Sequence, residues 1–223
     1  MLKVNFIFLF TRLFYGKYSP QYYFVYKKYV NKSAYRPCYK DSFIAHIEIF
    51  MENNENYEIH PTSQTINFVN FDFGSSMKEL KRSQGEPYYF TIERIGKEYI
   101  TGIGYNEDAL NTEIKTIYYF FRDKLFMGEY IFKSIPSQME NSIYKTLEDK
   151  YLSEPIINQS CFIIKDSSQS IIIPENTGFE LIIKYFCREN NDAYKLLKDY
   201  FNKYKRNGII KKKSISPDIF EKI

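Results

Sequence analysis

Short apolar segments separated by turn residues are the feature that most constrains how this chain folds. Four such segments follow one another at residues 88–95, 98–105, 113–121 and 125–132. The first two are separated only by Gly96-Lys97, a pair typical of a tight hairpin turn, and a polar loop is expected at 106–111. Strands connected in this way pair with their neighbours in the chain. The sequence therefore predicts a four-stranded antiparallel meander.

A helix with a recognisable start precedes this meander. Ser75 or Ser76 is a suitable N-cap, and Glu79 stands at or near the capping-box position. Gly85 and Pro87 then end the helix, because glycine accepts a left-handed conformation and proline prevents continuation. A strand is also expected upstream, at 65–69, where apolar residues alternate.

The second half of the chain follows a similar plan. Ser137 is expected to cap a helix that carries Met139, Ile143, Leu147 and Tyr151 on one stripe and ends within 150–155, with Glu140 three residues after the cap. Strands follow at 161–165, 170–173 and 179–187, and a last helix at 192–205. Gly85-Glu86-Pro87 and Ser153-Glu154-Pro155 occupy equivalent places in the two halves. The pattern predicts either a duplicated α-β-β-β unit, its meanders edge to edge or face to face, or two ordinary units with routine helix stops.

The predicted fold class is therefore α+β, with antiparallel meanders that are each preceded by a short helix, and with a C-terminal helix. Four parts are expected along the chain. They are a leader at 1–56, a helix and meander at 57–135, a second helix and meander with the last helix at 136–210, and a basic tail at 211–223.

The leader carries the net positive charge of the protein. The whole chain has a formal charge of +4, yet no acidic residue precedes Asp41, and Phe and Tyr are dense before that point. Charged residues such as Arg12 and Lys17 interrupt every window long enough for a membrane span. Three interpretations stay open: a signal peptide, an aromatic and basic surface for single-stranded nucleic acid or an anionic membrane, and a leader, disordered or upstream of a start at Met51.

One stretch of the first meander resembles a known family. It comprises Phe73-Gly74-Ser75-Ser76-Met77-Lys78-Glu79-Leu80, then Gln84-Gly85-Glu86-Pro87, then Tyr118-Tyr119-Phe120-Phe121-Arg122-Asp123-Lys124-Leu125. This pattern is similar to the SmpA/OmlA (BamE-like) domain, over about residues 73–134. The resemblance implies a small antiparallel sheet in a protein-binding module. The chain departs from the family in having no lipobox cysteine near its start and one helix before the sheet.

Residues for catalysis or metal binding are scarce. The chain has two histidines, His46 and His60, and three cysteines, Cys38, Cys161 and Cys187, without a CxxC pair. Cys161 and Cys187 lie at strand ends, which favours apolar packing. Gly102-Ile103-Gly104 lies within a strand, so it indicates close backbone approach rather than a dinucleotide site. We predict no catalytic residue, no metal and no cofactor.

Tyrosines on the predicted strands are the one positive indication of function. Two faces of a strand alternate, so some of these side chains are expected on the surface, where tyrosine suits a protein-binding face. The candidate binding residues are Tyr88, Tyr99, Tyr105, Tyr118 and Tyr130. The alternative is an ordinary sheet encoded by an A+T-rich genome.

The sequence thus favours a non-catalytic protein that binds a protein partner through its sheet. Two alternatives stay open. One is a small hydrolase-like enzyme that uses meander carboxylates among Glu93, Glu98, Glu107, Asp108 and Glu113. The other is a nucleic-acid or membrane-surface binder that uses residues 1–40. We expect a cytoplasmic protein, or an exported or membrane-associated one if the leader is a signal.

Overall fold

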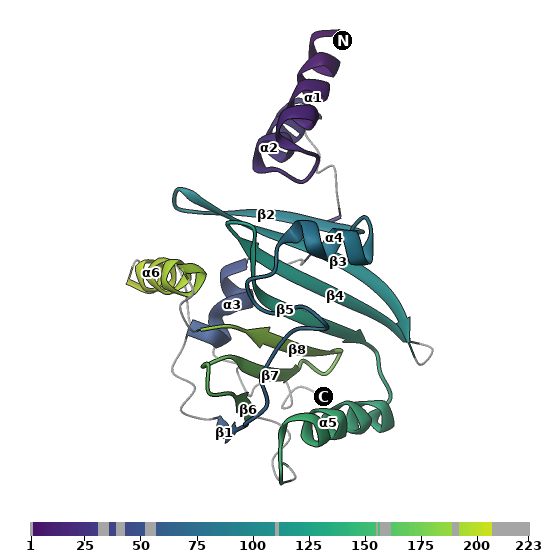
Figure 1. Ribbon diagram of the computed structural model, residues 1–223, viewed down its shortest axis with the longest axis vertical. Helices are drawn as coiled ribbons and strands as arrows, with labels where there is room; N and C mark the ends of the chain where they lie inside the picture. Colours follow the sequence, from purple (N-terminus) through teal and green to yellow (C-terminus); the bar gives the residue numbers. More distant parts are fainter. Residues whose placement is uncertain are drawn as a thin grey trace, which may run out of the picture.

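The fold is an eight-stranded sheet with helices on both faces, as the computed structural model in Figure 1 shows. The structure describes residues 2–30, 36–38, 43–51, 57–109, 112–154, 156, 162–188 and 192–206. The helices are α1 (Leu2–Tyr15), α2 (Pro20–Val30), α3 (Phe43–Met51), α4 (Met77–Gln84), α5 (Ser137–Tyr151) and α6 (Asp192–Arg206). The strands are β1 (Glu58–Pro61), β2 (Tyr89–Ile95), β3 (Glu98–Ala109), β4 (Thr112–Phe121), β5 (Lys124–Lys133), β6 (Phe162–Lys165), β7 (Ile171–Asn176) and β8 (Glu180–Phe186).

The strand order is β1-β6-β7-β8-β5-β4-β3-β2, and every pair is antiparallel except β1 with β6. The meander β2–β5 meets the meander β6–β8 where β5 pairs with β8. The two meanders therefore lie edge to edge in one sheet, which selects one of the two arrangements that the sequence left open. The α+β class with a C-terminal helix is confirmed. Duplication of the unit stays a prediction.

Local signals in the first meander agree with the structure. Ser76 is the N-cap of α4, and its side chain accepts the Glu79 amide while the Glu79 carboxylate accepts the Ser76 amide. Gly85 follows α4 with a φ of 80°. Gly96 turns β2 into β3 with a φ of 65°. These interactions lie within a few residues of one another, so the sequence alone defines them.

Three local predictions were wrong. The N-cap of α5 is Pro136, without a side-chain cap, and Ser137 is instead its first helical residue. The expected loop at 106–111 begins as strand, because β3 pairs with β4 as far as Ala109. The segment 65–69 joins no strand of the sheet, although Phe68 bridges to Phe71. Instead it crosses one face of the sheet.

Apolar cores fill both faces of the sheet. One face packs against α4, α5 and the chain that leads into α4, with Leu80 and Leu147 among the buried residues. The opposite face packs against α3 and α6, through Phe50 and Leu197. Since both faces are covered, β4 is buried without interruption from Lys115 to Phe121.

The leader predicted at 1–56 supplies part of this core. In α3, the side chains of Phe43 and Ile47 have no exposed surface, and Phe50 is 1% exposed. Cys38 is also fully buried, and its amide donates to Thr91 Oγ1 at 2.8 Å. These long-range contacts leave no sequence signal of their own. The predicted basic tail at 211–223 and Cys161 lie outside the described residues.

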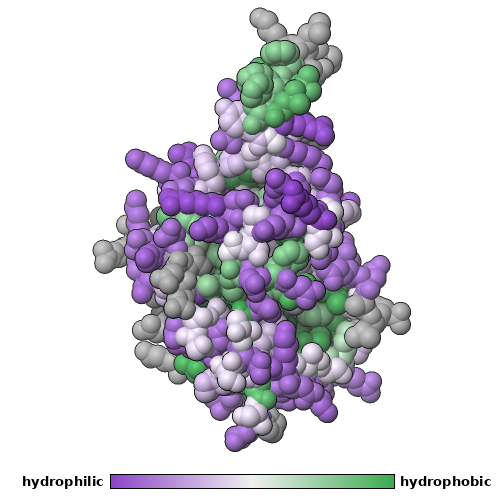
Figure 2. Space-filling model, in the orientation of Figure 1, coloured by the Kyte–Doolittle hydropathy of each residue, from purple (hydrophilic) through white to green (hydrophobic). Residues whose placement is uncertain are grey.

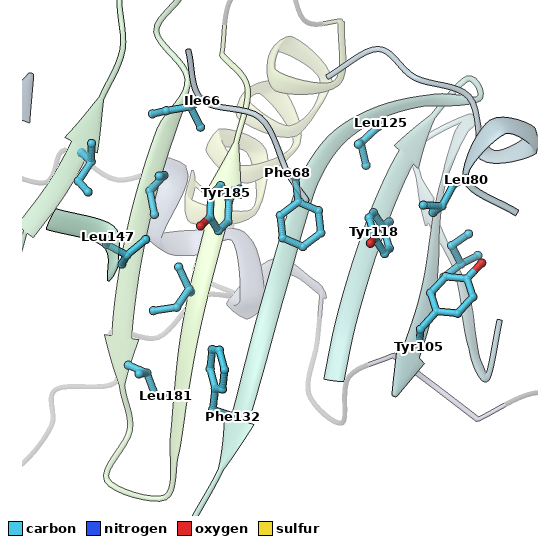
Figure 3. Close-up of a cluster of buried hydrophobic side chains, with 14 of the residues drawn as sticks. Ile66, Phe68, Leu80, Tyr105, Tyr118, Leu125, Phe132, Leu147, Leu181 and Tyr185 are labelled. Carbon is cyan, nitrogen blue, oxygen red and sulfur yellow. The ribbon is translucent and has the colours of Figure 1, made fainter. Parts of the chain in front are cut away.

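Phe68 fills a recess that Gly128 creates in the sheet. Gly128 on β5 stands opposite Tyr118 on β4 and Tyr185 on β8. The ring of Phe68 lies between these two tyrosines, 4.9 Å and 5.1 Å from their ring centroids (Figure 3). A Cβ at position 128 would lie 2.0 Å from Phe68 Cδ1, so only glycine leaves room for the ring.

Hydrogen bonds hold the chain around Phe68 in place. We call residues 62–75 the crossing segment. Its start is fixed by Asp166, whose Oδ2 accepts the Ile66 amide at 2.9 Å while its Oδ1 accepts the Ser170 amide at 2.8 Å. Its end pairs with β5, where the Gly74 amide donates to Leu125 O at 2.8 Å. Phe68 is thus positioned from both sides.

We expect Gly128→Ala to lower the free energy of unfolding by about 1–3 kcal/mol, because the added methyl overlaps the Phe68 ring. Urea unfolding monitored by circular dichroism measures this change. In a Phe68→Ala background the methyl enters vacated space, so its added cost should largely disappear. An equal cost in both backgrounds would contradict the contact.

Candidate functional site

The structure brings three of the five predicted binding tyrosines together, but inside the protein. Tyr105 and Tyr118 are 7% and 0% exposed, and their ring centroids are 6.1 Å apart. Tyr130 is half-buried, with its ring 5.0 Å from that of Phe68. The expectation that these side chains form an exposed face is therefore corrected, because the crossing segment and its flanking helices cover them.

The other two predicted tyrosines lie near the β2 edge of the sheet. Tyr88 is 47% exposed, and the guanidinium of Arg36 stands 4.5 Å from its ring centroid. Tyr99 is half-buried, and its ring packs against Phe24 of α2 at 5.5 Å. Only Tyr88 of the five thus presents a largely exposed ring.

Burial controls the ionisation of the enclosed tyrosines. It raises the pKa of Tyr105 to about 12, with a smaller contribution from Glu86. It also raises the pKa of Tyr130 to about 12, and raises that of Tyr118 further. The Tyr105 hydroxyl donates to Gly85 O at 3.0 Å. These phenols therefore stay neutral at physiological pH and behave as core residues.

The meander carboxylates are dispersed. Glu98 forms an ion pair with Arg122 at 2.6 Å, and Glu107 accepts from Thr116 Oγ1 at 3.2 Å. Burial raises the pKa of Glu93, which Lys27 partly counteracts. Asp108 and Glu113 stand opposite each other in the β3–β4 register, but both are exposed.

Histidine and cysteine take structural positions where their side chains are described. His60 lies on β1, with its ring 6.0 Å from that of Phe162. Burial raises the pKa of the Cys38 thiol to about 12, which makes the thiolate scarce. Cys187 is half-buried just after β8. Among the described residues, no three of His, Cys, Asp or Glu gather to hold a metal ion.

A different surface is the more distinctive one: an apolar stripe along α1. The helix presents Phe6, Leu9, Phe10, Leu13 and Phe14, which we call the α1 stripe. Their exposed fractions run from 47% for Phe10 to 73% for Leu13. The spacing of three and four residues places all five on one face of the helix. In Figure 2 this face is the strongly hydrophobic end of the molecule.

The opposite face of α1 packs against α2. The ring of Phe8 lies 5.4 Å from that of Tyr26 and 6.2 Å from that of Tyr29, and Thr11 is 6% exposed beside them. The two helices form a hairpin that projects from one end of the sheet (Figure 1). Because α2 occupies the inner face, the α1 stripe is directed outward.

Aromatic contacts attach the hairpin to the body. Tyr18, in the turn between the helices, is 9% exposed, with its ring 5.1 Å from that of Phe90 on β2. Tyr23 packs on the same ring at 5.9 Å. The Tyr18 hydroxyl donates to Glu86, and this hydrogen bond is the main reason that the pKa of Glu86 is lowered. The hairpin is thus docked on the β2 edge.

The charged side chains described on α1 and α2 are all positive. Arg12 is exposed on α1 beside it, and Lys27 and Lys28 are exposed near the end of α2. No acidic residue occurs in either helix. The sequence shows that the leader is aromatic and basic, but its composition does not predict its fold. The signal that identifies the helix is the recurrence of apolar residues at i, i+3, i+4, i+7 and i+8 from Phe6.

Comparison with protein-family models, with curated proteins and with solved structures found no match. The resemblance to the SmpA/OmlA domain stays a prediction. Among the described residues, no helix has both the length and the apolar character needed to cross a membrane.

We expect the stability of the protein to fall as the pH rises from about 10 to about 12. Tyr105 and Tyr130 have pKa values of about 12 when folded, against 10.0 as their ordinary value. The stability that these two tyrosines contribute is therefore complete below pH 10. It is lost as the pH rises from 10 to 12, because the same tyrosines ionise first in the unfolded chain. Each tyrosine should contribute a slope of about 1.4 kcal/mol per pH unit in this window. Urea unfolding at several pH values measures how the free energy of unfolding changes with pH. Tyr105→Phe should lower this slope by the contribution of one tyrosine. An unchanged slope would contradict the burial of this phenol.

Proposed function

We propose that the protein is a non-catalytic protein that attaches to anionic membrane surfaces through the α1–α2 hairpin. The observation that carries this proposal is the α1 stripe, with five large apolar side chains between 47% and 73% exposed on one helical face. A continuous exposed apolar surface of this kind marks a site of interaction with a protein or a membrane.

The chemistry of the hairpin supports a lipid surface as the occupant. Interfacial helices combine Phe and Leu on one face with Lys and Arg around it, and lie in the plane of the membrane. Here the apolar face is flanked by Arg12, with Lys27 and Lys28 on the neighbouring helix and no acid on either. Each cation near an anionic surface adds about 1 kcal/mol of attraction.

A protein partner on the same surface has less support. Protein interfaces are depleted in lysine, whereas the hairpin carries only positive charge. The tyrosine-rich sheet offers little surface to a partner, since α4, α5 and the crossing segment cover one face while α3 and α6 cover the other. Association of the hairpin with another protein chain is therefore the alternative result of the experiment, seen as self-association that depends on α1.

The test is co-sedimentation of the full chain with vesicles. We expect binding to phosphatidylcholine vesicles that contain phosphatidylserine, and much weaker binding to phosphatidylcholine alone. The variant Leu9→Ser/Leu13→Ser should reduce binding about tenfold or more, because two exposed leucines lose their burial in the bilayer. A matched control is Ile59→Ser/Phe179→Ser, which removes two exposed apolar side chains from the body and should bind normally.

A second pair of variants measures the electrostatic contribution. Arg12→Gln/Lys28→Gln should weaken binding and reduce its salt dependence, while Lys145→Gln/Lys195→Gln removes the same charge from α5 and α6 and should change little. The proposal is wrong if the full chain does not co-sediment with anionic vesicles. It is equally wrong if the serine substitutions on α1 abolish self-association, measured by analytical ultracentrifugation, while vesicle binding is unchanged.

A further inference from the structure

A basic groove lies where the hairpin meets α4. The groove has a volume of about 470 Å³, and its walls come from the end of α1, the α1–α2 turn, α4 and the β4–β5 turn. Its lining includes Lys17, Lys78, Lys81 and Arg82, with Asp123 as its one carboxylate. Four cations and one carboxylate thus line the groove, and Glu86, which forms an ion pair with Lys17, lies beside it.

The sequence of α4 explains why these cations gather. Lys78, Lys81 and Arg82 are spaced by three and four residues, so they share one helical face. Leu80, on another side of the helix, is 1% exposed and anchors α4 to the sheet. The capping box uses the carboxylate of Glu79 at the start of the helix. The basic face of α4 therefore lines the groove beside the hairpin.

Two of the cations have roles in docking the hairpin. Lys17 forms an ion pair with Glu86 at 3.5 Å, and Lys81 Nζ lies 4.2 Å from the ring centroid of Tyr18. Lys78 and Arg82 are exposed, and no carboxylate among the described residues forms an ion pair with either. Asp123 Oδ1 is engaged as an acceptor of the Met77 amide at 3.1 Å. Lys78 and Arg82 can thus turn to a ligand.

The groove lies at the C-terminal end of the helix that carries the α1 stripe. Tyr15, which lines the groove, directly follows Phe14 of the α1 stripe in the chain and is 55% exposed. If the stripe binds a membrane as proposed above, lipid headgroups around the end of α1 would lie near α4. Arginine binds phosphate through two parallel hydrogen bonds, and lysine adds a point charge.

We propose that this groove binds the phosphomonoester headgroup of a phosphorylated inositol lipid, with Lys78 and Arg82 as its principal contacts. The proposal rests on the membrane attachment proposed above and adds a lipid preference to it. A phosphomonoester carries nearly two negative charges and three acceptor oxygens, which a carboxylate headgroup such as that of phosphatidylserine does not offer.

The test compares two vesicle preparations of equal surface charge. One contains phosphatidylinositol 4,5-bisphosphate and the other contains phosphatidylserine, both in phosphatidylcholine. We expect the full chain to bind the first about tenfold more tightly, and Lys78→Gln/Arg82→Gln to remove most of that preference, since the two groups that contact the phosphomonoester are lost. The variant should bind the two preparations about equally. Lys145→Gln/Lys195→Gln, with the same change in charge, should keep the preference.

The outcomes separate this inference from the proposed function. Equal binding to the two preparations would falsify the headgroup site and leave membrane attachment intact. If the wild-type chain binds neither preparation, both proposals are wrong. Free inositol 1,4,5-trisphosphate, titrated without vesicles by calorimetry, tests the source of the phosphate. If free inositol 1,4,5-trisphosphate binds as tightly as the vesicles do, the groove binds a soluble anion and the proposal of a lipid ligand is wrong.

Discussion

The contact of Phe68 with Gly128 is the interaction on which the arrangement of this protein depends. A glycine in the middle of a strand leaves a recess between Tyr118 and Tyr185, and the ring of Phe68 fills it. Filling the recess brings the crossing segment down onto the sheet, where Asp166 holds it. Tyrosines that would otherwise face solvent thereby become core residues, with raised pKa values and no access to a partner.

Covering both faces of the sheet leaves the hairpin as the distinctive interaction surface. Helices α3 and α6 close one face, and α4, α5 and the crossing segment close the other. The α1–α2 hairpin attaches to the body through contacts with β2 and β3, and the outer side of α1 stays exposed. Hydrophobic residues gather at this end of the molecule (Figure 2), and the hairpin helices carry Arg12, Lys27 and Lys28 without an acidic residue. The proposed membrane attachment follows from this separation between a closed body and an open hairpin.

The α4 helix connects the body with the proposed lipid surface. One of its sides buries Leu80 against the sheet, and another presents Lys78, Lys81 and Arg82 to the hairpin turn. The capping box at Ser76 and Glu79 sets where this helix begins and hence which residues reach the groove. Docking through Tyr18, Lys17 and Glu86 also fixes the distance between the α1 stripe and the groove. A short helix with an ordinary start can thus set the geometry of both sites.

The sequence by itself determined the local elements: the capped start of α4, its end at Gly85, the hairpin at Gly96 and the existence of two antiparallel meanders. Each of these depends on residues close together in the chain. Only the tertiary structure decided which side chains are buried, because Phe68 and Gly128, or Cys38 and Thr91, meet across long stretches of sequence. For the same reason Tyr105 and Tyr118 were expected on a binding face and lie in the core. The apolar spacing of α1 is present in the sequence, but only the tertiary structure shows which face of α1 points outward, because α2 packs against the other face and attaches to the sheet.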